Sequence, residues 1–366
     1  KFGVPVVVRS SFAEGPGTAI VPADRAVIRP VSGVALAKSE ARLTLEGVPD
    51  QPGSSHTLFS QLAAASIAVD MIIQNAGHGG TANISFTVPE DDLEAALAIT
   101  GEVAAALGAG SLTYDRNLAK VSVVGLGMAT AEGVAGQLFA AISAAGINVN
   151  MITTSEIKIS VLVSREDAAR AVAAAHQAFG LEAVDGHLTA ATPLPMTKSD
   201  PLEVVRRLEG MEDLAIEGCQ LDASQSLVTF IDLPDTPGVV ADVFAEIGQA
   251  GLFVDMIVQS FPQAGRAEVS FTVSVADRDR AVTVAEAIAA ARGVRVTDVP
   301  HVAKLSITGV GIRSHAGVAD RLFAPLAEAG INIDLVSTSE VRVNVIVAAE
   351  AGERALALLR QAFGLD

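Results

Sequence analysis

Two short turns carry the residues best suited to bind a small ligand. Asp50-Gln-Pro-Gly53 and Asp235-Thr-Pro-Gly238 each follow a predicted strand and lead directly into a predicted helix. Backbone N–H groups and the positive end of the helix dipole at such a turn attract a carboxylate. The two aspartates would accept hydrogen bonds from an ammonium, and Gln74 and Gln259, at the end of the next strand, would bond a ligand side chain. The pattern fits a free amino acid, but it also fits an Asp-x-Pro-Gly corner that only caps its own turn.

No catalytic motif accompanies these turns. The sequence contains no GxxxxGK[ST], HExxH or CxxC, and Gly125-Leu-Gly127 has Thr130 where a dinucleotide fingerprint needs a third glycine. The six histidines are scattered, and the run Gly77–Gly80 is interpreted as a hairpin tip rather than a metal site. The single cysteine, Cys219, has no partner for an internal disulfide, which fits a reducing compartment. The sequence therefore predicts neither an active site nor a metal site.

The composition excludes several classes of function. The chain has 366 residues, 25 Lys and Arg against 42 Asp and Glu, a formal net charge of −17 and 4% aromatic residues. Such a charge repels nucleic acid and anionic lipid, and few aromatic rings are present to stack on bases. No basic-then-apolar signal segment and no apolar run long enough to span a membrane occur. We therefore expect a globular, cytoplasmic protein without nucleic-acid or membrane partners.

The two turns belong to a repeated unit. Val48–Gly53 recurs as Leu233–Gly238, an offset of 185 residues, as Gly53 and Gly238 show. Gly146-Ile-Asn148 recurs as Gly330-Ile-Asn332, an offset of 184 residues. Because the two offsets nearly agree, the duplicated unit is a pair of modules, roughly 31–181 and 215–366.

Each module alternates strand and helix patterns. Residues 41–47 and 82–88 alternate apolar and polar side chains, as a half-buried strand does, whereas Leu58, Phe59 and Leu62 have helical spacing. A second helix opens at Pro89. The first module is thus predicted to have strands at 41–47, 69–73, 82–88 and 111–114, with helices after the first and third. This βαββαβ order is that of a ferredoxin-like α+β unit.

The even modules lack one strand and the odd modules have one too many. The pattern of the second module stops near Leu181 and that of the fourth at Asp366, after two helices in each. The surplus runs Val31–Lys38 and Ala215–Leu221 precede the first and third modules. Because an unpaired sheet edge is a liability, we expect each surplus run to complete the sheet of the following even module. The pairs would then be interlocked, and a short helix is predicted at 201–211, within the linker.

Several of these segments resemble one known family. Val48–Gly53, Val69–Gln74, Gly146–Asn150 and Ile152–Ser160 are similar to the paired ACT modules at the C-terminus of aspartate kinases, and residues 3–18 resemble the end of the kinase lobe. The expected fold class is therefore α+β, with tandem ferredoxin-like ACT domains in two interlocked pairs. The expected boundaries are 1–30 for a remnant of the kinase lobe, 31–117 and 118–181 for the first two ACT domains, 182–212 for a linker, and 213–300 and 301–366 for the last two.

The resemblance also implies a function. In that family each ACT pair binds end-product amino acids, lysine and threonine, and inhibits the ATP-dependent phosphorylation of L-aspartate to 4-phospho-L-aspartate. The kinase lobe is absent from this chain, so no activity is expected of it alone, and ATP and Mg are expected only at that lobe. The implied partners are lysine, threonine, a kinase lobe or catalytic subunit, and a second copy in a homodimer. Two alternatives stay open, a separate regulatory subunit of aspartate kinase and a stand-alone amino-acid sensor. An RNA-binding ferredoxin-like module is disfavoured, since strand Ile157–Val163 offers only Lys158.

The family's effector contacts map onto matching positions of both pairs. In the first pair these are Asp50, Gln51, Pro52, Gly53, Ser54, Ser55, Ala68, Val69, Asp70 and Gln74 and, across the module interface, Ala135, Val149 and Asn150. In the second pair they are Asp235, Thr236, Pro237, Gly238, Val239, Val240, Phe253, Val254, Asp255, Gln259, Ala319, Ile333 and Asp334. The two sets differ in polarity and volume, for instance at Ser55 and Val240. We therefore expect different effector preferences, or one pair that has lost binding.

Overall fold

Four modules of the predicted type form one closed arrangement. The computed structural model describes residues 6–9, 18–20, 30–75, 79–125, 128, 131, 133–155, 157–182, 215–312, 315, 317–339 and 342–365. Apart from Glu182, the predicted linker 182–212 and its helix at 201–211 lie outside these residues, as does most of 1–30. Within 1–30 the described part is a small antiparallel pair, β1 (Val6–Val8) and β2 (Thr18–Ile20).

The first two modules share two long strands. Module 1 contains the second half of β3 (Gly33–Pro49), α1 (Ser54–Ala64), β4 (Ile72–Gln74), β5 (Thr81–Pro89), α2 (Leu93–Leu107) and the first half of β6 (Ser111–Val124). Module 2 contains the first half of β3, the second half of β6, α3 (Val134–Ala144), β7 (Met151–Ser155), β8 (Lys158–Ser164) and α4 (Ala168–Ala178).

Modules 3 and 4 repeat this plan. Module 3 contains the second half of β9 (Ala215–Pro234), α6 (Val239–Gln249), β10 (Ile257–Gln259), β11 (Arg266–Ser274), α7 (Arg278–Arg292) and the first half of β12 (Arg295–Val310). Module 4 contains the first half of β9, the second half of β12, α8 (Val318–Glu328), β13 (Leu335–Ser339), β14 (Arg342–Ala348) and α9 (Gly352–Phe363).

The interlocking expected from counting the strands of each module is confirmed. The first half of β3 pairs with the second half of β6, from Gly33 opposite Val124 to Ala37 opposite Lys120. After a register shift the second half of β3 pairs with the first half of β6, up to Glu46 opposite Ser111. Strands β9 and β12 are divided in the same way. Each long strand therefore serves two modules, and neither module of a pair has a complete sheet without the other.

One predicted strand is shorter than expected. The strand predicted at 69–73 begins at Ile72 and ends at Gln74. The Met71 N–H donates to the Thr87 hydroxyl at 3.1 Å, so a side chain takes the place of the regular ladder carbonyl at this point. The chain still follows β5, because the Asp70 N–H donates to Thr87 O at 3.0 Å.

The modules of one pair also join the modules of the other pair. Strand β4 of module 1 pairs antiparallel with β13 of module 4, and β7 of module 2 pairs with β10 of module 3. These two contacts close the strand order β10-β11-β9-β12-β14-β13-β4-β5-β3-β6-β8-β7 into a ring. The modules of the two pairs are thus joined side by side within one chain.

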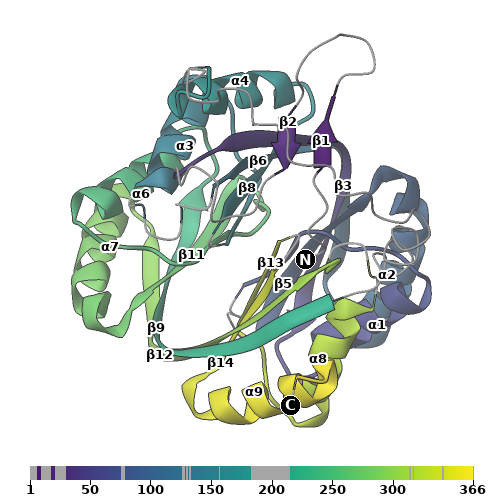
Figure 1. Cartoon of the computed structure of the whole chain (residues 1–366). Helices are drawn as coiled ribbons and strands as arrows, with labels where there is room; N and C mark the ends of the chain where they lie inside the picture. Colours follow the sequence, from purple (N-terminus) through teal and green to yellow (C-terminus); the bar gives the residue numbers. More distant parts are fainter. Residues whose placement is uncertain are drawn as a thin grey trace.

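Helices lie on the outside of this ring and the sheets face inward (Figure 1). The helices of modules 1 and 4 bury one core against their shared sheet, and those of modules 2 and 3 bury another. A third, smaller core lies between the inner sheet faces and includes Met71, Met151 and Met256. The predicted apolar residues of α1, Leu58, Phe59 and Leu62, are all buried, as their spacing required. No described helix is long and apolar enough to cross a bilayer.

Candidate ligand-binding sites

Four cavities lie where the turn that opens a helix of one module faces the module joined to it. We number each site after the module that supplies the turn. Site 1 is the turn Asp50–Ser55 against residues 331–333, and site 3 is the turn Asp235–Gly238 against residues 147–149. Site 2 is the turn around Gly133 against Phe253–Asp255, and site 4 is the turn around His315 against Val69 and Asp70. The four sites are therefore equivalent positions of one repeated architecture.

The predicted residues fall into these sites, but not in the predicted groups. The lining residues are Asp50–Ser55, Gln74 and Ile333 in site 1; Ala135 and Phe253–Asp255 in site 2; Asp235–Gly238, Val240, Gln259 and Val149 in site 3; and Val69, Asp70 and Ala319 in site 4. Ala68, Asn150, Val239 and Asp334 line none of these four cavities. The expectation that each site combines residues of one pair is wrong. Because β4 pairs with β13 and β7 pairs with β10, each site lies between a module of one pair and a module of the other.

Glycines shape the entry to the helix at sites 1 and 3. Gly53 has φ 98° and Gly238 has φ 99°, a left-handed conformation that favours glycine. Each is the residue before the first turn of its helix, where N–H groups have no intrahelical partner. A ligand carboxylate placed there meets backbone donors and the positive end of the helix dipole.

In site 1 the polar groups of the two modules are already bonded to each other. Asn332 Nδ2 donates to Asp50 Oδ1 at 2.9 Å, and Gln74 Nε2 donates to Ile333 O at 2.7 Å. The Ser55 hydroxyl donates to Gln74 Oε1, so both ends of this buried amide have partners. The free cavity volume is only about 10 Å³. Site 1 is thus largely satisfied by the protein itself.

Site 3 repeats these contacts with one omission. Asn148 Nδ2 donates to Asp235 Oδ1 at 3.0 Å, and Gln259 Nε2 donates to Val149 O at 3.0 Å. Val240 stands where site 1 has Ser55, so Gln259 Oε1 receives no such hydroxyl and is buried without a hydrogen-bond partner among the described residues. A buried carbonyl without a donor is unfavourable, and a donor from a ligand would relieve this cost. The two asparagines of sites 1 and 3 were not predicted as site residues, although the Gly-Ile-Asn repeat pointed to them.

The electrostatics of the two sites also differ. Burial first, and then the charges of Asp50 and Glu350, raise the pKa of Asp334 to about 6. The equivalent position next to site 3 is Asn150, which carries no charge. At Asp235, burial raises the pKa of the carboxyl, while the hydrogen bond from Asn148 acts in the opposite direction. Asp50 of site 1 therefore has a second carboxylate near it, whereas the equivalent neighbour of site 3 is the uncharged Asn150.

Replacing Asp334 by Asn should stabilise the protein in a pH-dependent manner. A raised pKa means that the folded protein resists ionisation of Asp334, so the wild type is penalised above pH 6 and relieved as the pH falls toward 4. We expect Asp334→Asn to raise the free energy of unfolding by about 1–2 kcal/mol at pH 7 and to leave it unchanged near pH 4. Urea denaturation at both pH values measures this, and an equal gain at both would contradict the explanation.

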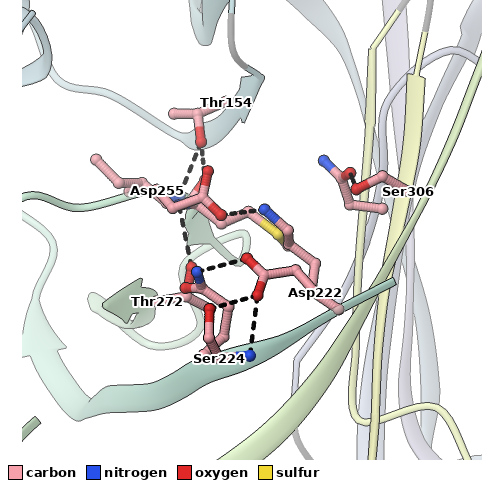
Figure 2. A network of polar contacts seen from close by, with 11 residues as sticks. Thr154, Asp222, Ser224, Asp255, Thr272 and Ser306 are labelled. Atoms are coloured by element: carbon pink, nitrogen blue, oxygen red, sulfur yellow. Dashed lines mark hydrogen bonds and ion pairs between the residues drawn. The ribbon is translucent and has the colours of Figure 1, made fainter. Parts of the chain in front are cut away.

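Site 2 is by far the most open of the four, with a cavity volume of about 410 Å³. Its polar end is formed by strands of module 3 and by Lys304 of β12. Figure 2 shows Asp222 and Asp255 in the same polar cluster there, each with hydrogen-bond partners of its own. Asp255 Oδ2 accepts from Lys304 Nζ, and Asp222 Oδ1 accepts from Ser224 N–H at 2.9 Å and from its hydroxyl at 2.6 Å. This volume can hold an amino acid without rearrangement.

Site 4, the counterpart in the other half, is nearly closed. Its cavity volume is about 20 Å³. Thr338 Oγ1 accepts from Ile72 N–H at 2.8 Å and donates to Asp70 O at 2.6 Å. The Lys120 ammonium contacts the carboxylates of both Asp70 and Glu40. Among the described residues, no group of three or more His, Cys, Asp or Glu side chains is arranged to hold a metal ion.

Comparison with known proteins agrees with this repeated architecture. Residues 43–101, 121–179 and 305–363 match one ACT domain model, and residues 227–293 match a second ACT domain model, so the matches cover all four modules and more than half of the chain. Together the four matched segments follow the four-module division described above.

The relatives are aspartate kinases. An aspartate kinase from Stutzerimonas stutzeri is 43% identical over 189 residues, 51% of this chain and 46% of the relative. An aspartokinase from Pseudomonas aeruginosa is 44% identical over 186 residues, 50% of this chain and 45% of the relative. The chain thus spans about half the length of the curated relatives that it matches. The crystal structure of an aspartate kinase from Synechocystis superposes on the whole chain with a TM-score of 0.82 at 32% identity and is itself covered to 62%.

Proposed function

The chain belongs to the ACT-domain family and matches the regulatory ACT region of aspartate kinases, and from this premise we propose that it binds lysine and threonine and mediates feedback inhibition of an aspartate kinase. The kinase, present as an attached lobe or as a catalytic subunit, would phosphorylate L-aspartate with ATP. An amino acid that binds one arrangement of the modules more tightly than another shifts the equilibrium between the kinase states, typically by ~1–3 kcal/mol. The assembly of whole proteins into a homodimer belongs to the same proposal.

Site 3 supports threonine as one effector, which would have to widen the cavity of about 20 Å³ between the turn and residues 147–149. The observation that carries this is the buried, unpartnered Oε1 of Gln259, which lies beside a turn suited to a ligand carboxylate. An amino acid at this turn would place its ammonium near Asp235, whose carboxyl already accepts from Asn148. A short side chain with a hydroxyl would then donate to Gln259 Oε1. Threonine has such a side chain, whereas site 1 has already supplied this donor with its own Ser55.

Site 2 supports lysine as the other effector. It is the only one of the four sites whose cavity in the described structure exceeds the volume of an amino acid, and its far end carries carboxylates. A lysine whose carboxylate lies at the turn before α3 would extend its ammonium toward Asp255. Both proposed effector sites thus lie between modules 2 and 3, and sites 1 and 4 serve to hold modules 1 and 4 together.

Paired substitutions test the proposal for threonine. Asp235→Ala should weaken threonine binding about 30-fold, because a charge-assisted hydrogen bond to a buried group contributes roughly 1.5–3 kcal/mol. The matched substitution Asp50→Ala in site 1 should change threonine affinity by less than about threefold. Isothermal titration calorimetry with threonine on the wild type and both variants measures this. Equal weakening by both substitutions would contradict the difference between the sites, and a wild type that binds neither amino acid would contradict the proposed function.

A further inference from the structure

The polar end of site 2 contains a lysine of the protein where a ligand's cationic group would lie. Lys304 Nζ donates to Asp255 Oδ2, and the two side chains are 11% and 22% exposed. A second carboxylate, Asp222, lies directly opposite Lys304 in the pairing of β9 with β12. The Lys304 charge contributes to the lowered pKa of Asp222, after the hydrogen bonds from Ser224 and Gln225 and against the effect of burial. The Lys304 ammonium thus contacts one carboxylate and has a second as its neighbour across the two strands.

A buried acceptor without a donor lines the same end of the cavity. Gln225 is 7% exposed, and its Nε2 donates to Asp222 Oδ2 at 2.8 Å. Its Oε1 lies buried without a hydrogen-bond partner in the described structure. A buried amide carbonyl in this condition is unfavourable, and only a donor can recover the cost. The polar end of site 2 therefore has one buried acceptor without a donor and one more carboxylate than ammonium.

The equivalent end of site 4 has the same charges, one ammonium and two carboxylates, but in a closed arrangement. Lys120 occupies the position of Lys304, and Glu40 occupies the position of Gln225. The Lys120 side chain is 4% exposed and contacts Asp70 directly, with Glu40 Oε1 at 3.9 Å. Two carboxylates thus hold this ammonium from two sides, and the cavity beside it is nearly closed. In site 2 the second carboxylate is instead Asp222, where the first pair has Ala37, and the neutral Gln225 can accept but does not hold Lys304 by charge.

We propose that site 2 takes a ligand whose side chain ends in an ammonium, and that this ammonium displaces Lys304 from Asp255 toward Asp222. The displaced Lys304 keeps a carboxylate partner across the two strands, and Gln225 Oε1 accepts from an ammonium that now lies between the two aspartates. The ammonium groups of the ligand and of Lys304 then face the carboxylates of Asp222 and Asp255, whereas the ligand-free site has one negative charge in excess. This inference rests on the proposed function, because it concerns the selection of the amino acid at site 2.

A comparison of lysine with norleucine, which has the same alkyl chain but no side-chain ammonium, tests the displacement. The test uses calorimetry on the whole chain, with threonine binding at site 3 as the control for folding. Lys304→Met removes the competing ammonium and should tighten lysine binding at least tenfold, while norleucine binding stays within about twofold. Gln225→Leu removes the acceptor and should weaken lysine about fivefold, again without effect on norleucine.

Asp222→Asn provides a second test if Lys304→Met does not fold. It removes the carboxylate that receives Lys304 and should weaken lysine at least fivefold, with norleucine and threonine unchanged. Lysine affinity that is equal in the wild type and all folded variants, or norleucine affinity that changes in parallel with it, would overturn the displacement. If the wild type binds neither lysine nor threonine, the proposed function itself fails, and this outcome is distinct from binding that is insensitive to Lys304.

Discussion

Removing residues 1–38 should unfold module 2, although the remaining part of β3 still belongs to module 1. The first half of β3 pairs with β6 from Gly33 to Ala37, and Val34 and Leu36 pack against the core of modules 2 and 3. Helix α4 of module 2 packs on the same strand. Losing Val31, Val34 and Leu36 from this core and one edge of the sheet should cost about 5 kcal/mol, which is comparable with the whole stability of a small domain.

Hydrogen exchange measured by mass spectrometry would show this loss directly. Amides of β6 from Val121 to Val124 and of β8 should lose their protection in the variant that lacks 1–38. The matched control removes only residues 1–29 and keeps β3 whole, so it should retain protection in both strands. If module 2 keeps its full protection without residues 33–38, the interlocking of the two modules does not contribute to stability as argued.

Phe59→Ala should destabilise the half formed by modules 1 and 4 by about 3–5 kcal/mol. Phe59 is almost completely buried in α1, and its ring lies 5.7 Å from that of Phe86 and 5.2 Å from that of Phe323 in α8. The substitution therefore opens a cavity and also removes the ring contact between the two modules. Because Phe323 also lines site 1, the position of the facing segment should become less well defined.

Two controls separate the loss of volume from the loss of the contact between modules. Phe59→Leu keeps most of the volume and should cost about 1–2 kcal/mol. Phe244→Ala is the equivalent change in the other half, where the ring of Phe244 lies 5.6 Å from that of Phe139. Region-resolved hydrogen exchange should place the loss in modules 1 and 4 for Phe59→Ala and in modules 2 and 3 for Phe244→Ala. Loss of protection spread equally over both halves in each variant would contradict this assignment.

The module fold could be predicted from the sequence because its signals are local. Alternation at 82–88 and the helical spacing of Leu58, Phe59 and Leu62 each depend on a few neighbouring residues, and both elements are confirmed. The strand is not half-buried as predicted, because Ser85 and Thr87 on its polar face are buried as well. Counting strands was enough to assign the surplus runs before modules 1 and 3, because a sheet edge left open is unfavourable. The joining of modules across the two pairs was not predictable in this way. It rests on the three-residue strands β4 and β10, whose edges carry no local sign of their partners.

The candidate sites show the same division between local and long-range information. The aspartate and glycine of each turn were found because they stand three residues apart at a helix start. Asn332, which donates to Asp50, lies 282 positions away from it along the chain. The pairing of Lys304 with Asp255 and the unsatisfied carbonyl of Gln225 depend on burial between strands. Composition and spacing do not report such burial, so the features that distinguish site 2 from site 4 required the structure.

The pairing of β4 with β13 and of β7 with β10 within one chain affects how the protein behaves on dilution. Partners tethered in one polypeptide meet at an effective concentration of the order of millimolar, whatever the amount of protein in solution. The interfaces that form the sites therefore persist at protein levels where separate subunits would dissociate. A two-fold dimer of identical single pairs would also have to build both of its interfaces from the same residues. The tandem chain is free of that constraint, so Ser55 can close one site while Val240 leaves Gln259 available in the other.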